Sequence, residues 1–192
     1  MGVAAMMAVL TDNSLKHGKI EALFTIDEEE GMVGAFGIKP GFLSGSIMLN
    51  LDTEEEGELC VGCAGGADVN ASYQYKEAEV PEEDIAYRIS LTGLKGGHSG
   101  CDIHLGRANA NKLIFRFLKE AVAEYEVRLA SIDGGSLRNA IPREAFAVVT
   151  LPVEDEPDFL ELIDEYRDIF NTEYKGIENR ISFKAEKTAT PK

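Results

Sequence analysis

Four consecutive acidic residues, Asp27 to Glu30, form the stretch of this sequence best suited to acid–base or metal chemistry. Neighbouring carboxylates repel one another unless a cation or solvent lies between them. A bound cation also lowers the pKa of its water to about 7, so a nearby carboxylate can take the proton at neutral pH. We therefore expect one part of this acidic cluster to bind a metal ion and another part to move a proton. The alternative is a solvated acidic turn at the start of a helix, where carboxylates stabilise the helix dipole.

Asp52 is the second acidic candidate. It follows an apolar run at residues 46–51, just as the acidic cluster follows an apolar run at residues 20–26. Carboxylates at the ends of parallel strands lie where α/β sheets bind their ligands. We therefore expect Asp52 to be a further oxygen ligand; the alternative is a loop residue that leads into a solvated acidic turn. The spacing of residues 53–58 does not match the calcium-binding loop of an EF-hand.

His98 is the third candidate, in the glycine-rich stretch at residues 93–100. Glycines on a loop between a strand and a helix let the backbone approach a ligand closely, so we expect a functional histidine here rather than an ordinary surface one. The stretch lacks the Lys-Ser or Lys-Thr pair of a phosphate-binding P-loop. Ser99 is a poor nucleophile candidate, because Cys101 stands where a nucleophile elbow requires glycine.

Two further motifs give weaker signals. Residues 134–142 link two predicted strands, and Arg138 and Asn139 are candidates there for fixing a substrate; the alternative is a long hairpin loop. Cys60 and Cys63 form a single C-x2-C pair, which is weak evidence for a zinc or redox site without a second pair. We interpret these cysteines as small side chains packed in a buried strand.

The elements that must position these residues divide the chain into two parts. In the first part, the pattern predicts a helix at residues 2–17 and buried strands at 20–26, 45–51 and 59–64. Helices between such strands are typical of βαβ units and a mostly parallel sheet. The composition changes at Gly65-Gly66, so we expect a partial α/β domain at residues 1–66 and a connecting β-ribbon or linker at residues 67–85.

In the second part, residues 86–192, the pattern predicts a compact α+β domain. Tyr87, Ile89 and Leu91 alternate with polar residues, which is typical of a half-buried strand. The predicted order is strand, helix, strand, strand, helix, strand, which is the ferredoxin-like arrangement. We expect strands at 86–94, 127–133, 145–151 and 181–185, and helices at 104–125 and 157–170.

Composition limits the classes of function. The net charge is −15 with a pI of about 4.6, so we expect no nucleic-acid partner, because the phosphate backbone demands a basic patch. No apolar run approaches the roughly 18 residues of a membrane span. Three cysteines imply no disulfide framework and favour a reducing cytoplasm. Neither end has the usual start or stop signals of an element, so we expect a piece of a longer protein.

The motifs together resemble the aminoacyl-histidine dipeptidases (Xaa-His dipeptidases) of the zinc-dependent aminoacylase and carboxypeptidase superfamily. The matching segments follow one another in family order, at residues 24–32, 49–58, 61–66, 94–112 and 138–144. The resemblance implies a fragment of a zinc-peptidase-like α/β catalytic domain followed by a ferredoxin-like lid. It also implies metal-dependent hydrolysis of carnosine-like Xaa-His dipeptides, with two zinc ions, or other divalent metals, per complete active site.

The resemblance also implies roles for individual residues. Glu28 would be the general base, and Glu29 and Asp52 would be zinc ligands. His98, carried on the lid, would stabilise the oxyanion of the tetrahedral intermediate. Asn139 would bind the substrate.

The chain departs from the family pattern in its histidines. The family places an H-x-D motif and a bridging Asp upstream and a metal-binding His near its C-terminus, but the only histidines here are His17, His98 and His104. We therefore expect an inactive central fragment, truncated at both ends, of an enzyme that acts on dipeptides.

Two alternatives remain open at this stage. One is a non-catalytic dimerisation or substrate-binding lid, which forms a homodimer by pairing an edge strand at residues 86–94 across a two-fold axis. The other is a different hydrolase of the superfamily, such as a tripeptidase or a deacylase.

Overall fold

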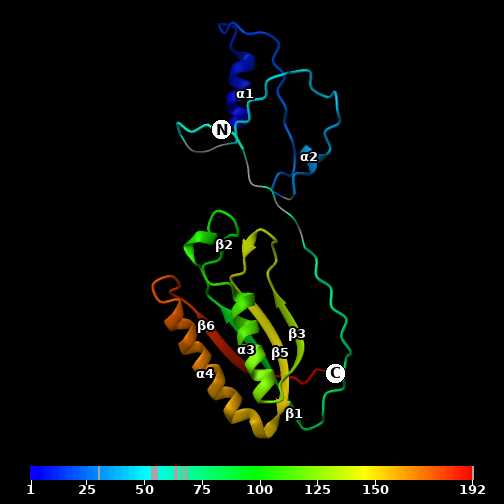
Figure 1. Cartoon of the computed structure of the whole chain (residues 1–192), viewed down its shortest axis with the longest axis vertical. Coiled ribbons are helices and arrows are strands. Elements are labelled where there is room, and N and C mark those ends of the chain that lie inside the picture. The colour runs from blue at the N-terminus through cyan, green and yellow to red at the C-terminus, as the bar shows by residue number, and fades with distance from the viewer. Residues whose placement is uncertain (30, 53–55, 63–64, 66, 68, 192) are drawn as a thin grey trace. The chain divides into compact units, whose positions relative to one another are not determined.

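A computed structural model of the whole chain describes its two compact units, Met1–Ser72 and Tyr73–Lys192 (Figure 1). Each unit is described by itself below. No helix of the described residues combines the length and the apolar composition that a membrane span requires. The described residues are 1–29, 31–52, 56–62, 65, 67 and 69–191.

The first unit contains two helices, α1 (Gly2–Thr11) and α2 (Val33–Phe36). Helix α1 ends before the predicted residue 17 because Asp12 starts a local turn. Its Oδ1 accepts hydrogen bonds from the backbone N–H (2.8 Å) and the hydroxyl (2.6 Å) of Ser14. Short polar side chains of this kind offer the backbone an alternative to the helix.

The strands predicted at residues 20–26, 45–51 and 59–64 are absent from the described part of this unit, and this prediction was wrong. None of its described residues is buried, and Ile47, Met48 and Leu49 are 80–83% exposed. Parallel strands are stable only when both faces of their sheet are covered. The described residues provide no such cover, so the apolar runs stay unpaired.

A carboxylate nevertheless joins the beginnings of two of these apolar runs. Glu21 accepts hydrogen bonds from the backbone N–H groups of Ser44 (2.8 Å) and Gly45 (2.9 Å). The ammonium of Lys19, above all, together with these N–H donors lowers the pKa of Glu21 to about 2. Residues 19–21 and 44–45 therefore lie side by side.

The second unit is a four-stranded antiparallel sheet with the strand order β3-β5-β1-β6. Helices α3 and α4 cover one face of it (Figure 1), and the chain order confirms the predicted ferredoxin-like arrangement and the mixed α/β class. The elements are β1 (Asp84–Thr92), α3 (Ala110–Glu124), β3 (Arg128–Gly134), β5 (Ala145–Pro152), α4 (Glu156–Glu173) and β6 (Ser182–Thr188).

Two details of this unit differ from the prediction. Helix α3 begins at Ala110 rather than at residue 104, because Gly106 adopts a left-handed conformation (φ +64°) and the side chain of Asn109 caps the helix by accepting the N–H of Lys112 (3.1 Å). Strand β1 pairs with both β5 and β6, so it is a central strand. The alternative of a dimer edge at residues 86–94 was therefore wrong.

The segment before the second unit's sheet contains no strand among its described residues, 67 and 69–83. The β-ribbon predicted within residues 67–85 is therefore not formed there, and a linker describes these residues better. The side chains of Val69, Tyr73 and Tyr75 are 77–89% exposed, so they have no core to pack against.

Fully buried aromatic side chains form the centre of the core. The ring of Phe117 from α3 lies 6.0 Å from Phe159 of α4 and 5.1 Å from Phe183 of β6, in edge-to-face geometry. Such pairs add to the stabilisation that burial of apolar area provides. These contacts join both helices to the sheet.

Replacing Phe159 by alanine should therefore destabilise the second unit by about 3–5 kcal/mol, since it removes a fully buried ring and leaves a cavity. The matched control is Leu160→Ala on the next position of α4, where the side chain is 37% exposed and the loss should stay below about 1 kcal/mol. Urea unfolding followed by circular dichroism measures both. Equal losses for the two variants would contradict this account of the core.

Alkaline pH should weaken the fold through Tyr166. Burial, reinforced by a hydrogen bond to Glu120 (2.5 Å) and the charge of that carboxylate, raises the pKa of Tyr166 to about 12. The folded chain then holds this proton more tightly than the unfolded chain, so stability falls as the pH rises from about 10 towards 12. Urea unfolding on either side of pH ~10 should show a shallower fall for Tyr166→Phe than for the parent chain.

Candidate functional site

The loop between β1 and α3 places His98 beside Asn139. Strand β2 (Gly97–His98) pairs antiparallel with β4 (Ala140–Ile141). The backbone N–H of Ser99 also donates to the carbonyl oxygen of Asn139 (2.8 Å). His98 and Asn139 are both exposed. The structure thus brings together two residues that the sequence predicts in one site.

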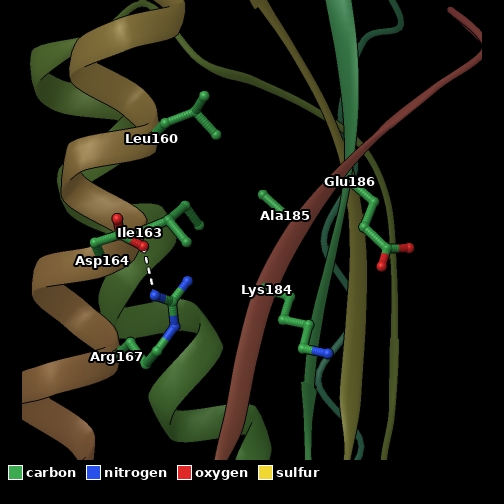
Figure 2. Close-up of a pocket in the computed structure, with 7 residues that line it drawn as sticks. All are labelled: Leu160, Ile163, Asp164, Arg167, Lys184, Ala185 and Glu186. Atoms are coloured by element: carbon green, nitrogen blue, oxygen red, sulfur yellow. Dashed lines mark ion pairs between the residues drawn. The ribbon is translucent and has the colours of Figure 1, made fainter.

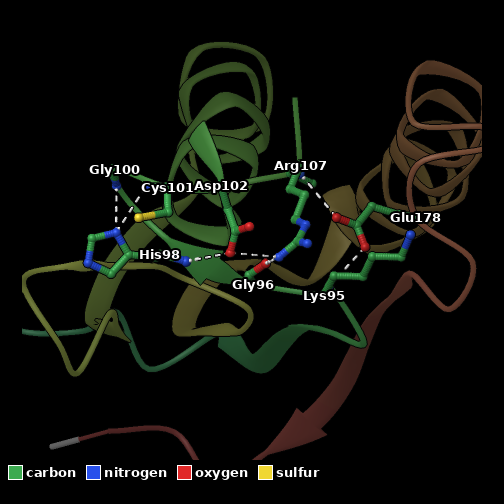
Figure 3. A network of polar contacts seen from close by, with 9 residues as sticks. Lys95, Gly96, His98, Gly100, Cys101, Asp102, Arg107 and Glu178 are labelled. Atoms are coloured by element: carbon green, nitrogen blue, oxygen red, sulfur yellow. Dashed lines mark hydrogen bonds and ion pairs between the residues drawn. The ribbon is translucent and has the colours of Figure 1, made fainter. Parts of the chain in front are cut away.

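The imidazole of His98 is held by its own loop (Figure 3). Its Nδ1 accepts hydrogen bonds from the backbone N–H groups of Gly100 (3.0 Å) and Cys101 (3.1 Å). A ring nitrogen that accepts two such bonds carries no proton, so the proton of the neutral ring is on Nε2. The loop therefore presents an N–H donor, which is the group needed to stabilise a developing negative charge on oxygen.

An ion pair between Asp102 and Arg107 lies within the same loop. Oδ2 of Asp102 accepts the backbone N–H of His98 (2.9 Å) and a guanidinium N–H of Arg107 (3.1 Å). The same nitrogen of Arg107 donates to the carbonyl oxygen of Gly96 (2.7 Å). A Cβ atom at Gly97 would lie only 2.4 Å from that nitrogen and 2.6 Å from Oδ2 of Asp102, so only glycine fits between them.

A buried carboxylate anchors the start of the same loop. Glu178 is 6% exposed and accepts the backbone N–H groups of Lys95 (2.9 Å) and Ala108 (3.1 Å) (Figure 3). Buried carboxylates are stable when such hydrogen bonds satisfy them. Glu178 therefore ties the segment before β6 to both ends of the stretch that contains His98.

Sequence reasoning missed these three charged residues. It gave no role to Arg107 and did not single out Asp102 or Glu178. Opposite charges at positions 102 and 107, around a glycine-rich loop, were the only local signal. Glu178 lies 70 positions from Ala108, and no pattern of residue types reveals a bond to a distant backbone N–H.

The acidic cluster lies on a tight turn of the first unit. The carbonyl oxygen of Glu28 accepts the N–H groups of Gly31 (3.3 Å) and Met32 (3.1 Å). Helix α2 contacts the segment before this turn, because the N–H of Gly34 donates to the carbonyl oxygen of Ile26 (3.1 Å). The backbone of Ile26 lies so close that a Cβ atom at position 34 would clash with it. The side chains of Glu28 and Glu29 are exposed on this turn. Glu30 lies outside the described residues.

The predicted metal ligands do not form a complete centre by themselves. Asp52 is exposed, and its N–H donates to Oδ1 of Asn50 (3.2 Å). Among the described residues, no three His, Cys, Asp or Glu side chains group in a way that can hold a metal ion. Zinc sites require three or four protein ligands. The carboxylates of Glu29 and Asp52 have suitable chemistry for zinc, but two ligands are too few for such a site.

The cysteine prediction was wrong where the structure describes it. Cys60 is exposed rather than packed in a buried strand, because no strand forms around it. Cys101 is also exposed, and Cys63 lies outside the described residues. No disulfide or zinc knuckle can be built on Cys60 alone.

A surface hollow of about 420 Å³ lies between α4 and β6 (Figure 2). An ion pair between Asp164 and Arg167 (2.5 Å) lines one side of it. No residue that the sequence predicts in a site borders this hollow. The lining residues are Leu160, Ile163, Asp164, Arg167, Lys184, Ala185 and Glu186.

Comparisons with known proteins confirm the resemblance predicted from the motifs. Residues 89–178 match the peptidase dimerisation domain family. The chain is 41% identical over all 192 residues to the cytosol non-specific dipeptidase of Escherichia coli (strain K12), of which it spans 40%. It also matches the crystal structure of aminoacylhistidine dipeptidase from Vibrio alginolyticus over its whole length, with a TM-score of 0.74 and 46% identity, and covers 39% of that protein.

Proposed function

We propose that this chain, which is similar to aminoacyl-histidine dipeptidases over its whole length, is the central part of an enzyme that hydrolyses Xaa-His dipeptides such as carnosine. The main support is that the acidic turn, Asp52 and the His98 loop occur together in a chain 41% identical to a dipeptidase. The chain spans about 40% of its relatives, so the activity belongs to the complete enzyme. The name of the first relative also supports a cytoplasmic location.

Glu29 and Asp52 are the proposed ligands for zinc in the complete enzyme, with two zinc ions per active site. Bound zinc would polarise the scissile carbonyl and supply a nucleophilic hydroxide. Carboxylate oxygens are accepted zinc ligands, and both side chains are exposed to solvent. The remaining ligands would come from elsewhere in the complete enzyme, since the described residues contain no group of three.

The chain's own residues would move protons and stabilise charge. The Glu28 carboxylate would take a proton from the attacking water and deliver it to the leaving amine. The Nε2–H of His98 would donate to the oxygen that becomes negative when the water adds to the peptide carbon. Asn139, on the segment paired with His98, would hold the substrate beside this donor.

A tripeptidase or deacylase would use the same side chains. The names of the two relatives favour a dipeptidase, and the second of them favours histidine as the residue released. Assays of the complete enzyme with Xaa-His dipeptides, other dipeptides, tripeptides and acylated amino acids separate these activities.

In the complete enzyme, His98→Ala should lower kcat for carnosine by about 10²–10³-fold, because it removes one donor to the oxyanion. The KM should change little, since this interaction forms only in the transition state. Steady-state kinetics measure both, with His104→Ala as the matched control on the same loop. The isolated 192-residue chain should show no hydrolysis. An unchanged kcat for His98→Ala removes this residue from the mechanism.

We also propose that the second unit forms a homodimer through the edge of β3. All seven residues of β3 are exposed, including Leu129 (45%) and Ile132 (37%). Helix α3, which contacts β3, exposes Phe115 and Val122 by about half. An edge strand with apolar side chains is a template for pairing.

The opposite edge is unsuited to the same role. Strand β6 exposes Lys184, Glu186 and Lys187, and charged side chains protect an edge strand from pairing. The match to a dimerisation domain supports a homodimer, and the exposed apolar side chains of β3 make it our candidate, rather than β6, for the strand that meets its copy.

Ile132→Lys should convert the complete enzyme from a dimer to a monomer, because it places two like charges across the proposed two-fold axis. Glu186→Lys on β6 is the matched control and should leave the dimer intact. Sedimentation velocity measures both masses. The proposal fails if Ile132→Lys remains dimeric while Glu186→Lys dissociates.

A further inference from the structure

We propose that Asp102 and Arg107 are positioning residues that fix the backbone turn at His98 and thereby the Nε2–H tautomer of its ring. The catalytic value of this arrangement rests on the proposed function. The positioning itself concerns hydrogen bonds within the lid, so it can be tested without any activity. Neither Asp102 nor Arg107 is proposed to contact the substrate.

Residues 98–102 form a turn that is closed from both ends. The backbone N–H of Asp102 donates to the carbonyl oxygen of His98 (3.1 Å), and the Asp102 carboxylate accepts the N–H of His98 (2.9 Å). The His98 ring in turn caps the N–H groups two and three positions further along the chain. This reciprocal capping is the logic of a capping box, with imidazole and Asp in place of Ser and Glu.

The tautomer of His98 depends on this turn. Nδ1 can accept two N–H groups only while Gly100 and Cys101 keep the turn conformation. Removing the Asp102 carboxylate leaves the N–H of His98 without this acceptor and opens one end of the turn. The ring can then rotate away, and its proton is free to occupy either nitrogen.

Arg107 holds the Asp102 carboxylate in place. One guanidinium nitrogen of Arg107, Nη1, donates both to Oδ2 of Asp102 and to the carbonyl oxygen of Gly96. Because Oδ2 of Asp102 also accepts the N–H of His98, these bonds connect the residues on both sides of Gly97. The two side chains are 25% and 30% exposed, so the pair is better shielded from water than an ordinary surface ion pair. The absence of a Cβ atom at Gly97 allows this close approach.

Asp102 is not a base that acts on the ring. Its Oδ2 bonds to the backbone N–H of His98, while Nδ1 of the ring is occupied by two other N–H groups. A carboxylate in a catalytic triad instead accepts a ring N–H. Asp102 therefore acts on His98 through the backbone, and its removal should change the orientation of the donor.

Nitrogen NMR of ¹⁵N-histidine-labelled chain tests the positioning directly. His98 should show a deprotonated Nδ1 and a protonated Nε2. His17 is an internal control, since its Nδ1 lies 2.7 Å from the carbonyl oxygen of Gly18 and must donate there. In Asp102→Ala the His98 signals should move to a mixture of both tautomers. Asp102→Asn, which keeps an oxygen acceptor, should restore the single tautomer, and circular dichroism verifies that each variant is folded.

Glu178→Gln is the matched control in the same network. It alters a carboxylate that bonds to Lys95 and Ala108 but not to the His98 turn. It should lower the unfolding temperature and leave the His98 tautomer unchanged. An unchanged His98 tautomer in both Asp102→Ala and Arg107→Ala overturns the proposal.

Kinetics of the complete enzyme test the consequence for catalysis. Asp102→Ala should lower kcat by about 10- to 100-fold with little change in KM, since small misplacements of a catalytic group have effects of this size. In the background of His98→Ala, the same change should lower kcat less than twofold, because its effect passes through His98. Additive losses in the double variant overturn that route.

The two ways of failing are distinguishable. If the complete enzyme hydrolyses no dipeptide, the proposed function fails while the tautomer of His98 still decides the positioning proposal. If hydrolysis depends on His98 but Asp102→Ala changes neither its tautomer nor kcat, the positioning proposal fails while the function stands.

Discussion

The His98 loop depends on carboxylates that accept hydrogen bonds from backbone N–H groups. A glycine-rich stretch has few side chains to pack and loses much conformational freedom when it is ordered. Apart from Leu94, which is buried in the core, the stretch has little to pack, so hydrogen bonds must fix the rest of its path. Glu178 fixes the N–H of Lys95 at its start, and Asp102 fixes the N–H of His98. The Glu178 bond fixes the start of the loop, whereas the bonds at the His98 turn determine where the ring lies and which nitrogen can donate.

The core of the second unit supplies the rigid support for this loop. Strand β1 ends at Thr92 just before the loop, and α3 begins at Ala110 just after it. Both elements are anchored by fully buried side chains, among them Ile89 and Phe117. A loop between two ends that are anchored in a packed core needs only a few local bonds to take one conformation.

How well the sequence predicts the fold depends on whether the residues that bury each apolar segment lie in the same unit. The alternation of Tyr87, Ile89 and Leu91 correctly predicts β1, because the residues that cover these side chains lie within the same unit. The apolar run at 45–51 has equal strand character, yet Ile47 and Met48 remain exposed. The pattern of apolar residues indicates that a segment suits a buried strand. It does not indicate whether the strands and helices that would cover that strand belong to the same chain.

The candidate site can be predicted only where the types of its residues by themselves indicate a chemical role. A histidine among glycines and a run of carboxylates are visible in the sequence, so His98, Glu28 and Glu29 are candidates that can be proposed in that way. Asp102 and Arg107 act on the backbone of other residues, and any acidic or basic residue in a loop looks the same until the chain is folded. Their function depends on geometry that only the folded loop supplies.

The bonds that orient His98 all lie between residues 96 and 107 of the second unit. The orientation of the His98 ring is therefore set by hydrogen bonds within its own loop. Preformed donors stabilise a transition state well because no reorganisation accompanies the reaction. In a metal-dependent peptidase the charge of the metal centre would vary with the bound ligands, whereas a donor fixed by its own loop keeps one orientation throughout. On the positioning proposal, Asp102 and Arg107 occur in this turn because they set the direction of one N–H group.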